Sequence, residues 1–138
     1  MEADAVVVGL GVGGEEVARR LAEAGLDVVG IEAELVGGEC PCWGCIPSKM
    51  MVRAAEILAE GRRIPGNAGT SVVVPDWAPV ARRIRDEASD SWDDTVAVER
   101  FERKGGHFVR GRARVTGPRS VEVAGRTFTA RRALPHWQ

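Results

Sequence analysis

Apolar runs, glycine turns and a helical repeat follow one another in the first third of the chain. Residues 5–8 form a short, mostly β-branched run, which predicts a buried parallel strand. A helical pattern follows, with Val17, Leu21 and Ala24 on one face. Residues 26–31 predict a second strand. This strand–helix–strand order predicts an α/β fold with a parallel sheet.

The middle of the chain predicts two further helices. One ends near Gly61, and its Met51 and Leu58 are expected to face the core. The other is a long helix that Asp76 caps and that ends before Gly105. Its apolar ridge repeats every four residues and consists of Val80, Ile84, Ala88 and Trp92.

In the last third the apolar period changes to two, which predicts strands. Residues 109–115 alternate small or apolar residues with arginines, so we expect one half-exposed strand with the arginines on its solvent face. Residues 121–129 predict a hairpin with its turn at Ala124 and Gly125. Together these segments predict a small β-meander.

Composition and charge narrow the class of protein. The chain has 138 residues and a net charge of −1, which gives no electrostatic case for nucleic acid or an anionic membrane as partner. The apolar run at residues 6–8 is far too short to span a bilayer, and no signal-peptide pattern is present. All three cysteines lie in one cluster, which favours a catalytic or metal-binding role over a secreted disulfide framework. We therefore expect a cytoplasmic protein.

The turn after the first strand is rich in glycine. Gly9, Gly11 and Gly14 fit the spacing G-x-G-x-x-G, with Gly13 beside them, and Glu32 ends the second strand. Such glycines allow a pyrophosphate to approach the N-terminus of a helix, and the acid accepts a hydrogen bond from a ribose hydroxyl. The pattern predicts dinucleotide binding; the alternative is a glycine turn kept for packing and a solvated acid.

The cysteine cluster lies just before the second helix. Cys40 and Cys45 could close a small disulfide loop if their Cα atoms come within about 4.4–6.8 Å. Pro47 suits the first turn of a helix, which puts Cys45 at the positive helix end, where a thiolate is favoured. With Cys42 the three thiols could instead bind Zn²⁺ or Cu⁺, although no fourth ligand is evident.

Residues 37–49 resemble the redox-active segment of the class I pyridine nucleotide–disulfide oxidoreductases, the flavoproteins related to dihydrolipoamide dehydrogenase, glutathione reductase and mercuric reductase. The shared pattern is Gly-Gly-x-Cys, four residues, then Cys-Ile-Pro-Ser-Lys. The resemblance implies that residues 1–132 are a Rossmann-like FAD-binding domain with a βαβ start, a redox helix, a long helix and a β-meander. Chains of this family are much longer, so the domain is expected to be truncated, with residues 133–138 a divergent tail.

The resemblance also implies roles for individual residues. Cys45 would be the thiol nearest the flavin, and Cys40 would exchange with the substrate after the two form a reversible disulfide. The charge of Lys49 would stabilise reduced flavin. Cys42 departs from the family pattern, either as a third exchanging thiol or, the preferred interpretation, as a small filler. Close approach of backbone to the flavin is implied for Gly37, Gly38 and Gly44.

The implied cofactor is FAD, with NAD or NADP as co-substrate of the full-length family, whose binding domain has no counterpart here. The implied partners are a small-molecule or thiol–disulfide substrate and, for the full-length family, a second subunit. The two histidines, His107 and His136, do not replace the family's catalytic His–Glu pair. We therefore expect the chain alone to lack nicotinamide-dependent activity. The resemblance thus implies part of an FAD-dependent oxidoreductase that moves electrons between flavin and a Cys40–Cys45 disulfide. The alternatives to this function are a catalytically inactive FAD-binding fragment or a small thiol- or metal-binding module.

Overall fold

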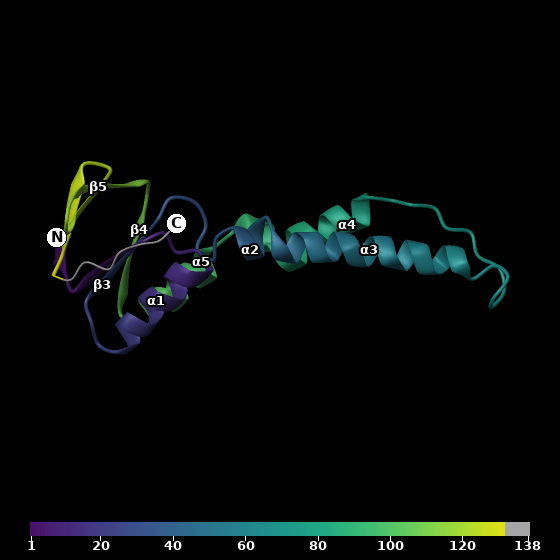
Figure 1. Ribbon diagram of the computed structural model, residues 1–138, viewed down its shortest axis with the longest axis horizontal. Coiled ribbons are helices and arrows are strands. Elements are labelled where there is room, and N and C mark those ends of the chain that lie inside the picture. The colour runs from purple at the N-terminus through teal and green to yellow at the C-terminus, as the bar shows by residue number, and fades with distance from the viewer. Residues whose placement is uncertain (132–138) are drawn as a thin grey trace. The chain divides into compact units, whose positions relative to one another are not determined.

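In the computed structural model, which describes residues 1–131, the chain divides into two units (Figure 1). Unit 1 contains Met1–Gly38 and the part of the chain from Asp93 onward, and unit 2 contains Glu39–Trp92. The tail that the sequence predicts at residues 133–138 lies outside the described residues.

Unit 1 is built on a parallel sheet with the strand order β2-β3-β4. These strands are β2 (Ala5–Val8), β3 (Val28–Glu32) and β4 (Gly106–Arg110). The central strand β3 is buried from Val28 to Ile31, because its two faces pack against different layers. A strand fully covered in this way reads as a continuous apolar run. The predicted parallel βαβ start and the α/β fold are both confirmed.

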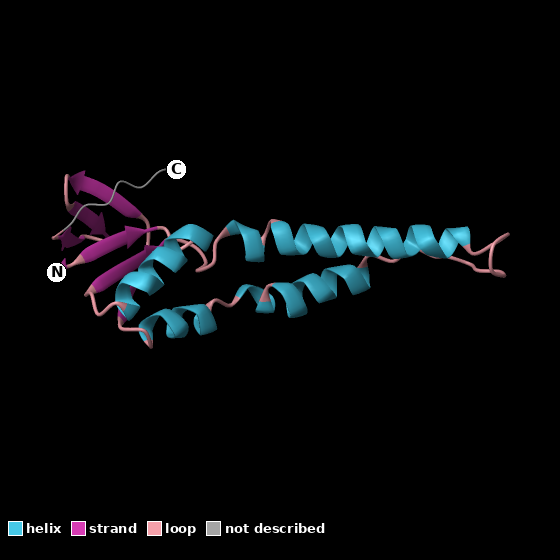
Figure 2. Ribbon diagram, turned by 60° about the horizontal axis from the view of Figure 1, so that its bottom comes forward, coloured by secondary structure: helices cyan, strands magenta, loops and turns pink. Residues whose placement is uncertain are grey.

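Two helices, α1 (Val12–Glu23) and α5 (Thr95–Glu102), cover one face of this sheet (Figure 2). The buried side chains of α1 are Ala18 and Ala22, whereas Val17 is 44% exposed. Of the apolar face that the sequence predicts on this helix, Leu21 is partly buried, whereas Val17 and Ala24 are exposed, so the prediction was wrong for these two residues. In the first turn of α1 the packing is tightest at Gly14, where a Cβ would lie 1.9 Å from the carbonyl oxygen of Gly9 in the preceding turn.

A second sheet covers the opposite face of β3. Its strands, in order across the sheet, are β1 (Glu2–Ala3), β7 (Arg126–Ala130), β6 (Ser120–Val123) and β5 (Ala113–Gly117). Phe128 of this sheet packs with Val29 and Ile31 of β3. The predicted hairpin is confirmed, and Ala124 and Gly125 both have positive φ, as a two-residue turn of type I′ requires.

The prediction of a single strand over residues 109–115 was wrong. The chain leaves the parallel sheet after β4, bends at Gly111 and enters the second sheet as β5. Gly111 has a φ of 150°, and a Cβ there would lie 2.6 Å from the side chain of Val123. The change of sheet also interrupts the alternation, so Val115 is 72% exposed instead of buried.

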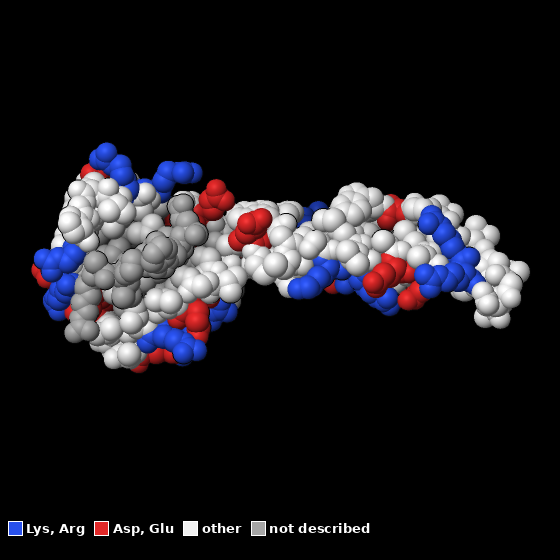
Figure 3. All heavy atoms as spheres, viewed as in Figure 1, with Lys and Arg blue, Asp and Glu red and all other residues white. Residues whose placement is uncertain are grey.

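Unit 2 contains α2 (Glu39–Cys42), α3 (Cys45–Arg63) and α4 (Ala78–Arg83). The predicted helix after the cysteine cluster is confirmed as α3. Met51 is 42% exposed, so the prediction that it faces a core was wrong; the surface drawn in Figure 3 shows broad areas of this unit without charged side chains. None of the helices within residues 1–131 is long and apolar enough to cross a membrane.

The predicted long helix is broken. After α4 the chain continues as a π-helical turn, Ile84–Ala88, and α5 begins only at Thr95. The hydroxyl of Ser89 donates hydrogen bonds to the carbonyl oxygens of Ile84 and Arg85. It thus competes with backbone N–H groups for carbonyl oxygens that a regular helix would use. The break follows, because Asp90, Ser91 and Trp92 all have φ between 48° and 60°. Such left-handed residues end a helix.

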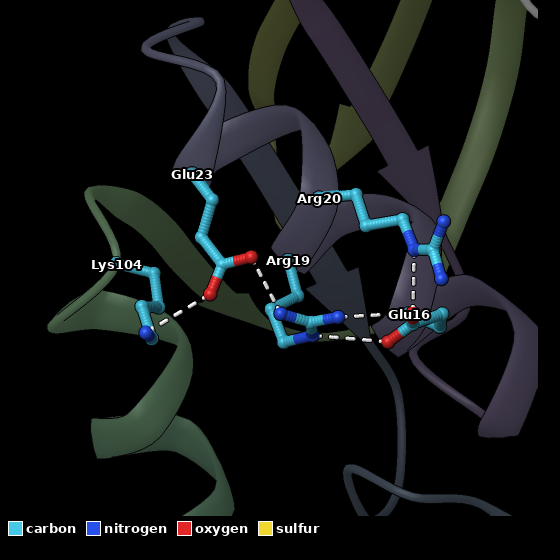
Figure 4. Close-up of polar contacts among 5 residues, drawn as sticks. All are labelled: Glu16, Arg19, Arg20, Glu23 and Lys104. Carbon is cyan, nitrogen blue, oxygen red and sulfur yellow. Dashed lines mark hydrogen bonds and ion pairs between the residues drawn. The ribbon is translucent and has the colours of Figure 1, made fainter.

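The solvent face of α1 carries a network of ion pairs (Figure 4). Glu16 accepts hydrogen bonds from Arg19 and from Arg20, and Arg19 also bonds Glu23. Lys104, just beyond α5, reaches Glu23 at 2.9 Å. The hydrogen bonds from Arg19 and then from Arg20 lower the pKa of Glu16 to about 2.

We expect Glu16→Gln to reduce the loss in the free energy of unfolding as the pH falls on the acid side. A carboxylate whose folded pKa lies below its unfolded value stabilises the protein above the unfolded pKa, and this contribution is lost as the pH falls through the folded pKa. For Glu16 that window runs from 4.5 down to about 2. Thermal unfolding should show the parent losing more stability than the variant across this window. The difference should shrink in 1 M salt because these groups are exposed; equal slopes at low salt would contradict the assignment.

Candidate functional site

The glycine turn between β2 and α1 contains one glycine that packing requires. A Cβ on Gly14 would lie 1.9 Å from the carbonyl oxygen of Gly9. Gly9 cannot yield easily, because its N–H donates to the carbonyl oxygen of Ile31 at 2.8 Å and its φ is 85°. For Gly14, therefore, close packing is a sufficient explanation.

Two other glycines of the turn have no such explanation. A Cβ on Gly13 would meet nothing within 4 Å, and one on Gly11 would only touch the Cα of Gly38, at 3.9 Å. Gly11 also has an ordinary φ of −66°. The first helical hydrogen bond of α1 runs from Glu15 N–H to the Gly11 carbonyl, so the N–H groups before it have no partner within the helix. The open space around these two positions thus lies at a helix N-terminus, a place that favours an anionic group such as a pyrophosphate.

Glu32 is held at the same end of the sheet. Its Oε2 accepts the Leu10 N–H at 2.7 Å, and its Oε1 accepts the Glu34 N–H at 2.9 Å. The side chain is thus fixed beside the glycine turn instead of being merely solvated. A carboxylate can accept about four hydrogen bonds, so capacity remains for a ribose hydroxyl.

The segment after β3 lies against the glycine turn. Gly37 N–H donates to the Leu10 carbonyl at 2.7 Å, and Gly37 pairs with Gly11 in an isolated bridge. Gly38 has a φ of 69°, and a Cβ on it would lie 2.8 Å from the Cα of Gly11. The predicted binding residues that unit 1 brings together are Gly9, Gly11, Gly13, Gly14, Glu32, Gly37 and Gly38.

The sequence analysis missed two residues beside this segment, Asp94 and Arg110. The carboxylate of Asp94 accepts the Val36 N–H at 2.7 Å and two hydrogen bonds from Arg110. Arg110 was predicted to be only a solvent-facing arginine. No local pattern could reveal the contact, because Asp94 and Val36 are 58 residues apart.

The cysteine pair lies at the start of α3 in unit 2. Cys45 is the first residue of α3 and Cys40 belongs to α2, and both are thiols. The hydrogen bond between their side chains, with burial, raises the pKa of Cys40, while Lys49 and the Cys45 N–H act in the opposite direction. The structure therefore brings Cys40, Cys45 and Lys49 together, as a dithiol beside a cation. The disulfide between the two cysteines stays a prediction.

Cys42 occupies a different environment. It is buried, and its carbonyl accepts the indole N–H of Trp92 at 3.1 Å. Cys40 and Cys42 are two positions apart on α2, and side chains at that spacing do not face each other. Gly44 has a packing reason of its own, because a Cβ there would lie 3.2 Å from the Glu39 carbonyl oxygen.

Two further features of the chain bear on the candidate site: groups of side chains that could ligate a metal ion, and the histidines. Within residues 1–131, no three His, Cys, Asp or Glu side chains are grouped so that they could hold a metal ion. His107 lies in β4 with its Nε2 3.3 Å from a carboxylate oxygen of Asp27, as an exposed pair. His136 lies outside the described residues.

Comparison with known proteins gives a consistent result. The family model described as pyridine nucleotide-disulphide oxidoreductase matches residues 3–134. A dihydrolipoyl dehydrogenase of Thermus scotoductus is 33% identical over 92% of this chain and 27% of its own length. One of Chlorobaculum parvum is 33% identical over 87% and 25%. A soluble pyridine nucleotide transhydrogenase of Photobacterium profundum is 46% identical over 45% and 12%. The chain spans about a quarter of the length of the two dehydrogenases.

Proposed function

Because this chain belongs to the pyridine nucleotide-disulphide oxidoreductase family, we propose that it is the FAD-binding, dithiol-carrying part of such an enzyme. In this proposal the glycine turn of unit 1 binds the FAD pyrophosphate, and Glu32 binds the ribose. Cys40 and Cys45 of unit 2 then exchange electrons with the flavin. Bound FAD would supply the two-electron chemistry that no side chain of the protein provides.

The observation that carries the proposal is the empty space at Gly11 and Gly13. The fold itself would accept a side chain at both positions, so their lack of one is best explained by a ligand that must approach the backbone. The N-terminus of α1 offers N–H groups and a positive dipole end to the negative charge of a pyrophosphate. Glu32, already fixed by two backbone N–H groups, is ready to accept a hydrogen bond from a ribose hydroxyl without further ordering.

The dithiol completes the proposed electron path. Reduction of a Cys40–Cys45 disulfide takes up two electrons and two protons and gives two thiols. The side-chain contact between the cysteines supports this pairing. Lys49 lies one turn into α3 and contributes a positive charge to the dithiol and, in the proposal, to reduced flavin.

The relatives suggest the wider reaction. By similarity to the proteins named dihydrolipoyl dehydrogenase, we propose a thiol–disulfide substrate of the dihydrolipoyl type. NAD or NADP is proposed as the co-substrate, a homodimer as the assembly of the whole enzyme and the cytoplasm as its location. Cys40 would be the thiol that exchanges with the substrate.

Flavin binding tests the proposal. After incubation with FAD and removal of free flavin, the parent protein should be yellow and absorb blue light. Gly11→Ala should weaken binding by roughly tenfold or more, since about 1.4 kcal/mol of steric conflict is tenfold in affinity. Glu32→Ala should cost on the order of 1–3 kcal/mol in binding. Affinity is measured by flavin fluorescence titration, and unfolding curves check that each variant is folded.

Glu34→Ala is the matched control for the acid. Its backbone N–H still donates to Glu32, and only a neighbouring carboxylate is removed, so flavin affinity should stay within about twofold. If Gly11→Ala and Glu32→Ala both bind FAD as the parent does, the turn is only structural. A colourless parent that takes up zinc instead would support a thiol- or metal-binding module.

A further inference from the structure

The carboxylate of Asp94 joins three segments of unit 1. Its side chain is only 13% exposed. One oxygen accepts the Val36 N–H at 2.7 Å, and Arg110 at the end of β4 donates to both oxygens at 2.7 and 2.6 Å. Hydrogen bonds in which a partner is charged are roughly twice as strong as neutral ones. The carboxylate therefore ties the segment after β3 to β4 and to the start of α5.

This use of Asp94 differs from the usual one at its position. Asp94 is the N-cap residue of α5, where an aspartate normally bonds the N–H groups of its own helix. Here its side chain makes no such bond. The neighbouring Asp93 bonds both the N–H and the hydroxyl of Thr95 instead. The Asp94 carboxylate is thus available to bond the backbone of the segment 36–38, at the Val36 N–H.

Arg110 is itself held in place. Its guanidinium lies over the ring of Phe108, 4.7 Å from the centroid. It stands opposite Glu32 in the register of β3 and β4, at the end of the sheet where the glycine turn lies. The ion pair is therefore anchored on a strand rather than on a mobile loop, which gives it the stiffness to position a neighbour.

The segment that Asp94 holds forms one side of the proposed pyrophosphate site. Val36 is 4% exposed, Gly37 bonds Leu10, and Gly38 lies against Gly11. A displacement of this segment would change the space beside Gly11, where the flavin nucleotide is proposed to approach. Asp94 holds this segment in place through its hydrogen bond with the Val36 N–H.

We propose that Asp94, oriented by Arg110, is a positioning residue that sets the Val36–Gly38 segment against Gly11 for binding of the FAD pyrophosphate. The inference rests on the proposed function, because it concerns the same site. Asp94 does not contact the nucleotide in this proposal. It acts through the backbone of Val36, so its loss should loosen the segment first and weaken flavin binding as a consequence.

The test compares Asp94→Ala with Asp93→Ala, which removes the carboxylate that bonds Thr95 at the start of the same helix. Without FAD, hydrogen exchange of the 36–38 amides should become at least about tenfold faster in Asp94→Ala and stay near the parent rate in Asp93→Ala. FAD affinity should fall about tenfold in Asp94→Ala. In Asp93→Ala it should stay within about twofold of the parent value. Asp94→Asn keeps an oxygen acceptor for Val36 but loses the charge, so it should restore part of both properties.

Each outcome decides the matter. Equal flavin affinity of the parent, Asp94→Ala and Asp94→Asn would overturn the inference while the proposed function stands. Equal losses in the Asp93 and Asp94 variants would show a merely structural role and overturn it too. If Asp94→Ala does not fold, Asp94→Asn and Arg110→Gln carry the same comparison. A parent that binds no FAD would overturn the proposed function, and the inference with it.

Discussion

Replacing Gly14 with alanine is expected to destabilise unit 1 by on the order of 3 kcal/mol, the upper part of the usual range for overpacking. The added Cβ would lie 1.9 Å from the Gly9 carbonyl oxygen and 3.0 Å from its carbon. Both are backbone atoms, so no side-chain rotation relieves the clash. Chemical denaturation should show a lower midpoint for the variant, or no folded baseline.

Gly13→Ala is the matched control, one position away in the same helix. A Cβ there meets nothing within 4 Å, and alanine is the better helix former by about 0.5–1 kcal/mol. We therefore expect the two substitutions to have opposite signs, Gly14→Ala destabilising and Gly13→Ala neutral or stabilising. A Gly14→Ala protein with the midpoint of the parent would show that α1 can move away from the turn, and that Gly14 is not needed for packing.

The parts of the fold that sequence predicted well are those with a local cause. The run at residues 5–8, the glycine turn and the second strand follow one another within one βαβ unit. The hairpin turn at Ala124 and Gly125 needs only two residues that accept positive φ. In both cases the short-range pattern and the three-dimensional packing require the same residues.

The errors have physical causes as well. At residues 109–115 an alternating pattern predicts one strand, but the chain changes sheet at Gly111, which no alternation can report. On α1, Val17 is more apolar than Ala18, yet Ala18 is the buried residue and Val17 the exposed one, because hydropathy alone does not fix which face of a helix meets the sheet. The break after Ser89 did have a local signal, a cluster of Ser and Asp, which the four-residue apolar ridge outweighed.

The candidate site divides in the same way. Motif spacing singled out Gly11 and Glu32 as candidates, because a pyrophosphate and a ribose demand residues at set distances along a βαβ unit. Motif spacing could not separate Gly14 from Gly11. Close packing explains the glycine at position 14 but not the one at position 11, and this distinction needs the atoms around each position. Asp94 was missed because its contact with Val36 depends on the fold alone.

Oxidation of the thiols is expected to join Cys40 to Cys45 and to leave Cys42 reduced. The Cys45 side chain lies near enough to raise the pKa of Cys40, whereas Cys42 is buried and stands two positions from Cys40 on α2. With glutathione disulfide as oxidant, the two protein thiols give up two protons and two electrons, one S–S bond forms, and two glutathione molecules are released. A thiolate must attack first, so the pair that is in contact should close fastest.

Single serine variants make this an all-or-none prediction. Cys42→Ser should lose two titratable thiols on oxidation, as the parent does, and peptide mapping should find Cys40 linked to Cys45. Cys40→Ser and Cys45→Ser should each form no internal disulfide and carry only mixed disulfides with glutathione. Unfolding midpoints of the Cys40 and Cys45 variants equal to that of the parent would show that the thiols serve chemistry and not packing, since Cys40 is partly buried and Cys45 is exposed. A dominant disulfide that contains Cys42, in the parent or in either of these variants, would sink the assignment and make Cys42 a member of the redox pair.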